Sequence, residues 1–170
     1  MLLVRRERLT PADHQTHRHY TFSVPEACTR LNIDVRYSPK FLSAADSREL
    51  VKRAVAAQRA SLAPRVGHEL GEQWAADFEG AELIVPNLLT IALDDAAGAY
   101  RGAGHRHAQD QHLTLGVDSA SPGLVAGPLP AGAWTLTLSA HTIVSDQCDV
   151  EIQIGAETAN RAPLASGNSA

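Results

Sequence analysis

Histidine is the residue in this sequence best suited to chemistry, with 8 copies among 170 residues. Three of them lie close together, at His105, His107 and His112, with Asp110 between. Imidazoles at positions i and i+2 of an extended segment project to one side, and zinc sites are built from three or four such ligands. The spacing predicts a divalent-metal site at His105, His107 and His112. The alternative is a solvent-facing loop rich in histidine and arginine.

Two further groups of residues have metal-binding chemistry. His17 and His19 share the i, i+2 spacing, with His14 nearby, and form either a second metal cluster or a polar surface. Asp94 and Asp95 suit a hard cation such as Ca²⁺, although a turn-forming acidic pair is the simpler interpretation.

Evidence for catalysis is weak in this sequence. A Ser/His/Asp set can be drawn from Ser121, His141 and Asp146, but no Gly-x-Ser-x-Gly elbow supports it. We therefore predict no catalytic residue. The stretch 100–112 is predicted to be a polar loop that offers a ligand surface, with these side chains: Tyr100, Arg101, His105, Arg106 and His107.

These side chains must be positioned by strands, because apolar and polar residues alternate with period two along most of the chain. The pattern predicts a mainly β protein, an antiparallel β-sandwich or jelly roll of about 7–8 strands within a domain 1–156. Residues 157–170 lack periodicity and are predicted to be a flexible tail or linker. The predicted strands lie near 2–8, 20–24, 31–37, 89–93, 113–117, 134–138 and 150–154.

One segment departs from the alternation and predicts a helical insertion. Its helical part covers about 43–80, and the whole insertion between the strands spans 43–82. Good helix formers fill 43–63, Ser43 and Asp46 have capping-box spacing, and Pro64 is expected to end the helix. A second short helix is predicted from Glu69 to Phe78. A narrow apolar stripe on the first helix should cover one end or face of the sandwich, and its members are Val51, Ala54, Val55 and Leu62.

Composition narrows the classes of partner. The net charge of −4 argues against a duplex nucleic-acid binder, and no apolar run is long enough for a membrane span. The first eight residues lack the apolar core of a secretory signal, so we expect a cytoplasmic protein. Cys28 and Cys148 are then free thiols, with a disulfide as the open alternative.

Two stretches carry a resemblance to a known family. NLLTIALDDAAGAYRGAGHR (87–106) and ASPGLVAGPLPAGAWTLTL (120–138) resemble the β-sandwich domain that precedes the catalytic domain of CehA/McbA-type metallohydrolases, with weaker support from 20–39. The catalytic part of those enzymes belongs to the PHP superfamily. Its metal site begins with His-x-His, whereas here Ser139 stands two residues before His141, and only 24 residues follow Asp146.

The resemblance therefore implies an accessory module without the PHP catalytic domain, and not an enzyme. Such a module would have no cofactor and would make protein or ligand contacts, with a metallohydrolase chain or a second copy of itself as partner. Two alternatives stay open: a small metal-dependent hydrolase or metal-binding protein that uses 105–112, and a carbohydrate- or small-ligand-binding module.

Overall fold

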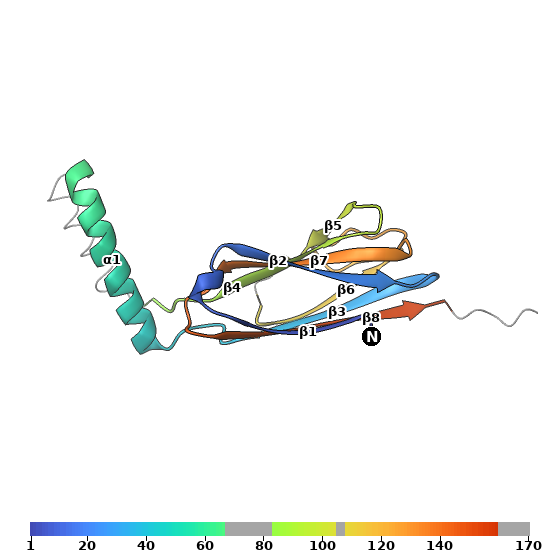
Figure 1. Ribbon diagram of the computed structural model, residues 1–170, viewed down its shortest axis with the longest axis horizontal. Helices are drawn as coiled ribbons and strands as arrows, with labels where there is room; N and C mark the ends of the chain where they lie inside the picture. The colour runs from blue at the N-terminus through green and yellow to red at the C-terminus, as the bar shows by residue number, and fades with distance from the viewer. Residues whose placement is uncertain (67–82, 105–107, 160–170) are drawn as a thin grey trace, which may run out of the picture.

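The structure is a computed structural model that describes residues 1–66, 83–104 and 108–159. Its strands form two antiparallel four-stranded sheets packed face to face (Figure 1). Sheet A has the order β1-β8-β3-β6 and sheet B the order β2-β7-β4-β5, which is the strand order of a jelly roll. The elements are β1 (Leu3–Leu9), η1 (Pro11–Asp13), β2 (Thr16–Val24), β3 (Cys28–Ser38), α1 (Ala44–Val66), β4 (Leu88–Asp94), β5 (Tyr100–Ala103), β6 (Asp110–Gly116), β7 (Gly132–Thr142) and β8 (Cys148–Thr158).

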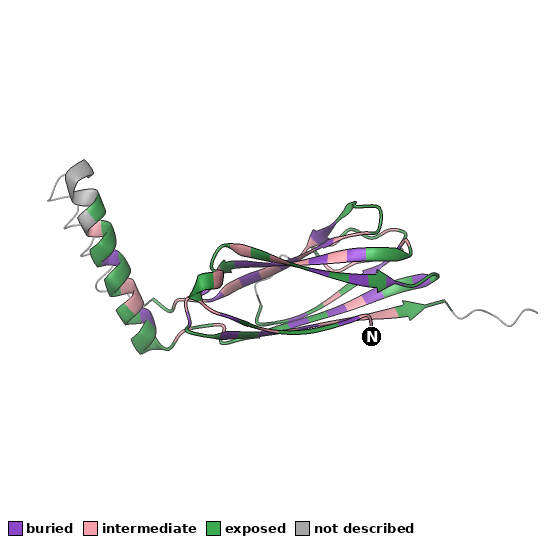
Figure 2. Ribbon diagram, viewed as in Figure 1, coloured by how far each residue is buried: buried purple, intermediate pink, exposed green. Residues whose placement is uncertain are grey.

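The core lies between the two sheets, where the inward-facing residues of the alternating strands are buried (Figure 2). Trp134 is fully buried at its centre and packs near Phe22, with ring centroids 6.4 Å apart. Its indole Nε1–H donates to the carbonyl of Pro130 at 2.8 Å, so the large ring buries its one polar atom without loss of a hydrogen bond.

The mainly β prediction with a helical insertion is confirmed, and each predicted strand lies within or beside an observed one. The structure corrects two boundaries. Residues 100–103 form strand β5, although the glycines at 98, 102 and 104 favoured a loop. Strand β8 continues through Glu157 to Thr158, two residues into the predicted tail, because it pairs there with the start of β3. Residues 160–170 lie outside the described residues.

The two cysteines are free and buried, and the fold explains why no disulfide joins them. Cys148 begins β8 opposite Leu9, whereas Cys28 lies opposite Thr158 at the far end of the same strand. Ten residues of strand separate the two positions, or about 33 Å at the usual rise per residue. Burial has the largest effect on the Cys148 thiol and raises its pKa to about 11, so this thiol stays protonated at neutral pH.

Helix α1 projects from one end of the sandwich and does not lie along either sheet (Figure 1). Ser43 accepts a hydrogen bond from the backbone N–H of Asp46 at 3.1 Å, which confirms the predicted start. The helix continues through Pro64, whose fixed φ lies in the helical range, and is described as far as Val66. The second predicted helix lies outside the described residues.

The predicted apolar stripe on α1 does not cover the sandwich. Val55 is buried, but Val51 is only partly buried and Ala54 is exposed. The Leu62 side chain lies outside the described ones, and the other three residues, which are small, offer too little apolar area to hold a 23-residue helix against a sheet. No helix among the described residues is long and apolar enough to cross a membrane.

Two short stems connect α1 to the sandwich and pair with each other. Leu42 donates its N–H to the carbonyl of Val85 at 3.0 Å, and Asn87 donates to the carbonyl of Lys40 at 2.8 Å. Val85 in turn donates to the Ser47 hydroxyl at 3.1 Å, within the first turn of the helix. The helix is therefore fixed at its base by hydrogen bonds from a segment about forty residues later in the chain.

The Asn87 side chain ties these stems to the connection between β7 and β8. It is fully buried, and its Nδ2 donates to the carbonyl of Pro39 at 2.9 Å and to the hydroxyl of Ser145 at 2.7 Å. Its Oδ1 accepts from the backbone N–H of Val144 at 2.8 Å. One amide thus satisfies polar groups from two other segments and joins them to its own.

We expect Asn87→Ala to lower the free energy of unfolding by about 3 kcal/mol, because it leaves several buried polar groups without partners. Urea denaturation followed by circular dichroism measures the change. The matched control is Asn32→Ala on β3, whose amide contacts only the Glu157 carboxylate at the surface and should cost about 0.5 kcal/mol or less. Equal effects of the two substitutions would contradict the role given to Asn87.

Candidate functional site

The predicted ligand residues Tyr100 and Arg101 are neighbours on β5, but they lie in opposite environments. Tyr100 is 62% exposed, whereas Arg101 is only 6% exposed. The prediction of a loop over 100–112 is wrong at both ends of that stretch, because 100–103 form strand β5 and 110–112 begin strand β6. Three of its predicted ligand residues, His105, Arg106 and His107, lie outside the described residues.

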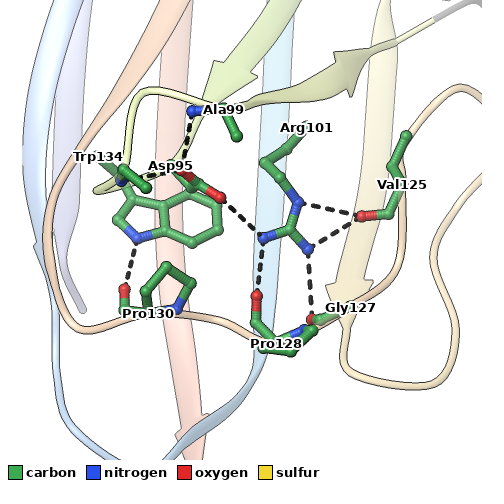
Figure 3. A network of polar contacts seen from close by, with 9 residues as sticks. Asp95, Ala99, Arg101, Val125, Gly127, Pro128, Pro130 and Trp134 are labelled. Atoms are coloured by element: carbon green, nitrogen blue, oxygen red, sulfur yellow. Dashed lines mark hydrogen bonds and ion pairs between the residues drawn. The ribbon is translucent and has the colours of Figure 1, made fainter.

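Arg101 is held by the loop between β6 and β7 (Figure 3). Its Nη1 donates to the carbonyl of Pro128 at 2.8 Å, and its Nη2 donates to the carbonyls of Val125 at 3.0 Å and Gly127 at 3.3 Å. Its Nε also donates to Val125, at 3.3 Å. The guanidinium therefore fixes three backbone carbonyls within four consecutive residues of a loop, 125–128.

The remaining contacts of Arg101 neutralise its buried charge. Its Nη1 lies 3.4 Å from Oδ2 of Asp95, and both side chains are less than one-tenth exposed. Its guanidinium also lies over the Trp134 ring, 5.3 Å from the centroid. With the loop carbonyls, these contacts account for all five N–H donors of the guanidinium. Arg101 thus acts as a structural clamp on the loop, and its role as a ligand residue stays a prediction.

Asp95 completes the clamp from the β4–β5 turn. Its Oδ1 accepts the backbone N–H groups of Ala97 and Ala99, each at 2.9 Å. Burial acts to raise the pKa of Asp95, but these two hydrogen bonds and Arg101 outweigh it and lower the pKa below its usual value. Of the two interpretations of the Asp94–Asp95 pair, Asp95 therefore has the role of a turn residue.

His112, the described member of the predicted metal set, lies on the outer face of sheet A. Its Nδ1 lies 2.5 Å from Oδ1 of Asp34, directly across from it on β3. Both side chains are more than half exposed. No group of three metal-ligating side chains occurs among the described residues. Because His105 and His107 lie outside those residues, the predicted metal site stays a prediction.

The surroundings of His112 form a shallow depression of about 300 Å³ on sheet A. Two residue pairs along the same strands from the His112–Asp34 pair, Arg36 lies 2.5 Å from Asp110. Glu151 across β8 accepts from Arg6 at 3.1 Å. Exposed pairs of this kind contribute little free energy. The depression is a solvated surface in which opposite charges already meet.

Three other histidines lie on the outer face of sheet B, each beside a hydroxyl. Nδ1 of His17 lies 2.9 Å from the Ser139 hydroxyl, and Nδ1 of His19 lies 3.0 Å from the Thr137 hydroxyl. Nε2 of His141 lies 2.8 Å from Thr90. The His17–His19 cluster and the His141 motif are thus brought to one polar face, a juxtaposition that spacing along the chain did not reveal.

Sequence reasoning missed a groove of about 430 Å³ at the base of α1. It lies between the first turns of the helix and the β7–β8 connection, two segments about one hundred residues apart. The only local signal was Phe41, an aromatic residue placed just before the helix start. The groove is lined by Pro39, Phe41, Leu42, Ser43, Asp46, Glu49, Leu50, Arg53, Val144, Ser145, Asp146 and Gln147.

Comparisons with known proteins add little to this geometry. No protein-family model matches the chain, and no curated protein is significantly similar to it. A crystal structure titled GEBA250068378, from Sulfurospirillum deleyianum, aligns over 90% of this chain and 98% of that chain, with 11% sequence identity and a TM-score of 0.29. That similarity is too low to support an argument about function.

We expect Arg101→Met to lower the free energy of unfolding by about 3 kcal/mol or more, because it leaves Asp95 charged and buried and frees three loop carbonyls. The matched control is Arg36→Met, which removes an exposed pair and should cost about 1 kcal/mol or less. Urea denaturation measures both changes. A similar small loss for the two variants would contradict the clamp.

The lowered pKa of Asp95 predicts a pH dependence with a definite sign. A carboxyl whose pKa is depressed by folding contributes stability above its unfolded pKa of about 3.9, and that contribution is lost as the pH falls through the folded pKa. The stability difference between wild type and Asp95→Asn should therefore be constant near neutral pH and shrink below about pH 4. Thermal unfolding of both proteins across this range tests the prediction, and a difference that stays constant to the acid limit would refute it.

Proposed function

We propose that this protein is a non-catalytic contact module whose partner docks at the end of the jelly roll from which α1 projects. The observation that supports the proposal is the projecting helix with a groove at its base. A 23-residue helix whose side chains between Ala44 and Arg59 are mostly exposed contributes little to the core of its own chain. Its extended surface is suited to contact with another protein.

The groove supplies the apolar part of the proposed contact. Phe41 is 55% exposed at its edge, and Leu50 and Val144 line it from the two sides. Ile84, in the stem that pairs with the Phe41 segment, is 50% exposed. Exposed apolar side chains gathered within a polar surface are typical of protein contact sites.

Charged side chains around the groove and along the helix supply the polar part of the proposed contact. Asp46, Glu49 and Asp146 border the groove, with Arg53 among them. Farther along the helix, from residue 51 to 66, the charged residues of the sequence are all basic: Lys52, Arg53, Arg59 and Arg65. A partner that fits both regions carries a basic segment beside an apolar side chain for the groove and an acidic patch for the helix.

The partner we propose is a PHP-type metallohydrolase chain. The resemblance of 87–106 and 120–138 to the domain that precedes such enzymes supports this choice. In this arrangement the jelly roll positions the hydrolase or shapes access to its substrate, and the reaction takes place on the partner. The metal-dependent and carbohydrate-binding alternatives stay predictions.

The test is co-expression with a PHP hydrolase encoded in a neighbouring reading frame, followed by native mass spectrometry and calorimetric titration. We expect a complex with a Kd in the micromolar range or below, and Phe41→Ser should weaken it at least tenfold. The matched control is Val4→Ser, which removes a similarly exposed apolar side chain on β1, away from the helix. Absence of a complex, or equal weakening by both variants, would overturn the proposal.

A further inference from the structure

The four edge strands of the sandwich differ in how their outer edges are covered. The segment after β6 covers β5 and part of β6: Ala103 donates to the carbonyl of Gly123 at 2.9 Å, and Gly116 donates to that of Ser119 at 2.8 Å. On the opposite side, β1 pairs with β8 alone and β2 (Thr16–Val24) pairs with β7 alone among the described strands. The sequence of β1 is LVRRERL, and charges of this kind protect an edge strand, whereas β2 is a nine-residue edge strand that can accept a further strand.

The geometry of antiparallel pairing limits how a second copy of β2 could bind here. Directly opposite residues of an antiparallel pair must point to the same face of the sheet. The two-fold axis must therefore place one residue opposite its own copy, because an axis between two residues would place neighbours, which point to different faces, opposite each other. An axis through Tyr20, the midpoint of β2, pairs all nine residues. In this register His17 lies opposite Ser23 of the second copy, and His19 lies opposite Thr21.

These pairs repeat a chemistry that β2 already uses. On its β7 side, His17 meets a serine hydroxyl and His19 meets a threonine hydroxyl through Nδ1. In the symmetric register the second copy again offers a serine to His17 and a threonine to His19. An imidazole can form hydrogen bonds through both ring nitrogens. The outer face of β2 is therefore self-complementary in hydrogen bonding.

The inner face places Tyr20 at the centre of the pairing. Tyr20 is 8% exposed, and its buried hydroxyl lies beside Glu7 and Arg18 of its own chain. An axis through Tyr20 places two tyrosine residues directly opposite each other, and aromatic cross-strand pairs stabilise antiparallel sheets.

Charge on the inner face does not prevent this pairing. Inward-pointing charges often protect an edge strand, and Arg18 is such a residue. Its guanidinium, however, lies 2.7 Å from Glu7 and 2.6 Å from Asp13 of its own chain. The symmetric register places this neutralised group opposite Phe22 of the second copy, an aromatic side chain that accommodates a guanidinium.

We propose that two copies of this chain associate through antiparallel pairing of their β2 strands about a two-fold axis at Tyr20. Sheet B then continues as one eight-stranded sheet across the dimer. The inference is independent of the proposed hydrolase partner, because β2 contributes no residue to the groove at α1.

Sedimentation velocity and native mass spectrometry of the full chain test the association. Wild type should be dimeric at tens of micromolar. His19→Glu with Thr21→Glu places like charges directly opposite in the dimer and should weaken association at least tenfold. His19→Lys with Thr21→Glu places opposite charges there and should retain the dimer. These two side chains are exposed, so the fold should be preserved, as circular dichroism would verify.

A mixing experiment tests the register. Directly opposite Cα atoms lie about 4.5–5.5 Å apart, within the range of a disulfide, whereas diagonal positions lie about 7–8 Å apart. Under mild oxidation, His19→Cys chains mixed with Thr21→Cys chains should therefore cross-link far more than either variant alone. A monomeric wild type, a dimer unaffected by the paired glutamates, or equal cross-linking by the unmixed variants would overturn the proposal.

Discussion

The buried guanidinium of Arg101 is the interaction on which the loop-rich side of this molecule depends. A cation inside a sandwich is strongly unfavourable unless it is neutralised and fully hydrogen-bonded. Here Asp95 provides the counter-charge, the carbonyls of Val125, Gly127 and Pro128 accept its protons, and the Trp134 ring covers one side. The loop before β7 takes its conformation from these contacts, and its beginning covers the edges of β5 and β6.

Asn87 has the corresponding role at the opposite side of the fold. Its amide joins the stems of α1 to the β7–β8 connection, so the helix has a defined origin even though it projects from the sandwich. Among the described residues, the polar side chains whose types suggested chemistry in the sequence mostly form hydrogen bonds and ion pairs within the chain. Among the described residues, two surfaces that remain open to other molecules are the α1 groove and the outer edge of β2.

The architecture could be predicted from the sequence because alternation is a local property of each strand. The exception was β5, a short strand that contains Gly102, where a positive φ and close contact with the backbone of Gly123 exclude a side chain. Site residues were harder to predict. Arg101 lies in a polar stretch typical of a surface loop, and its burial depends on carbonyls more than twenty residues later. The groove joins segments about one hundred residues apart, and local pattern carries no information about such a pairing.

We propose that this jelly roll acts through contact at two places, the α1 stems and the edge strand β2. Hydrogen–deuterium exchange followed by mass spectrometry tests that claim directly, with the chain compared alone at low concentration, alone at high concentration, and with a hydrolase partner. We predict concentration-dependent protection confined to Thr16–Val24 and partner-dependent protection confined to residues 39–59, 83–87 and 144–147. Protection that instead centred on residues 100–104 and 110–116, without change at either place, would contradict the account.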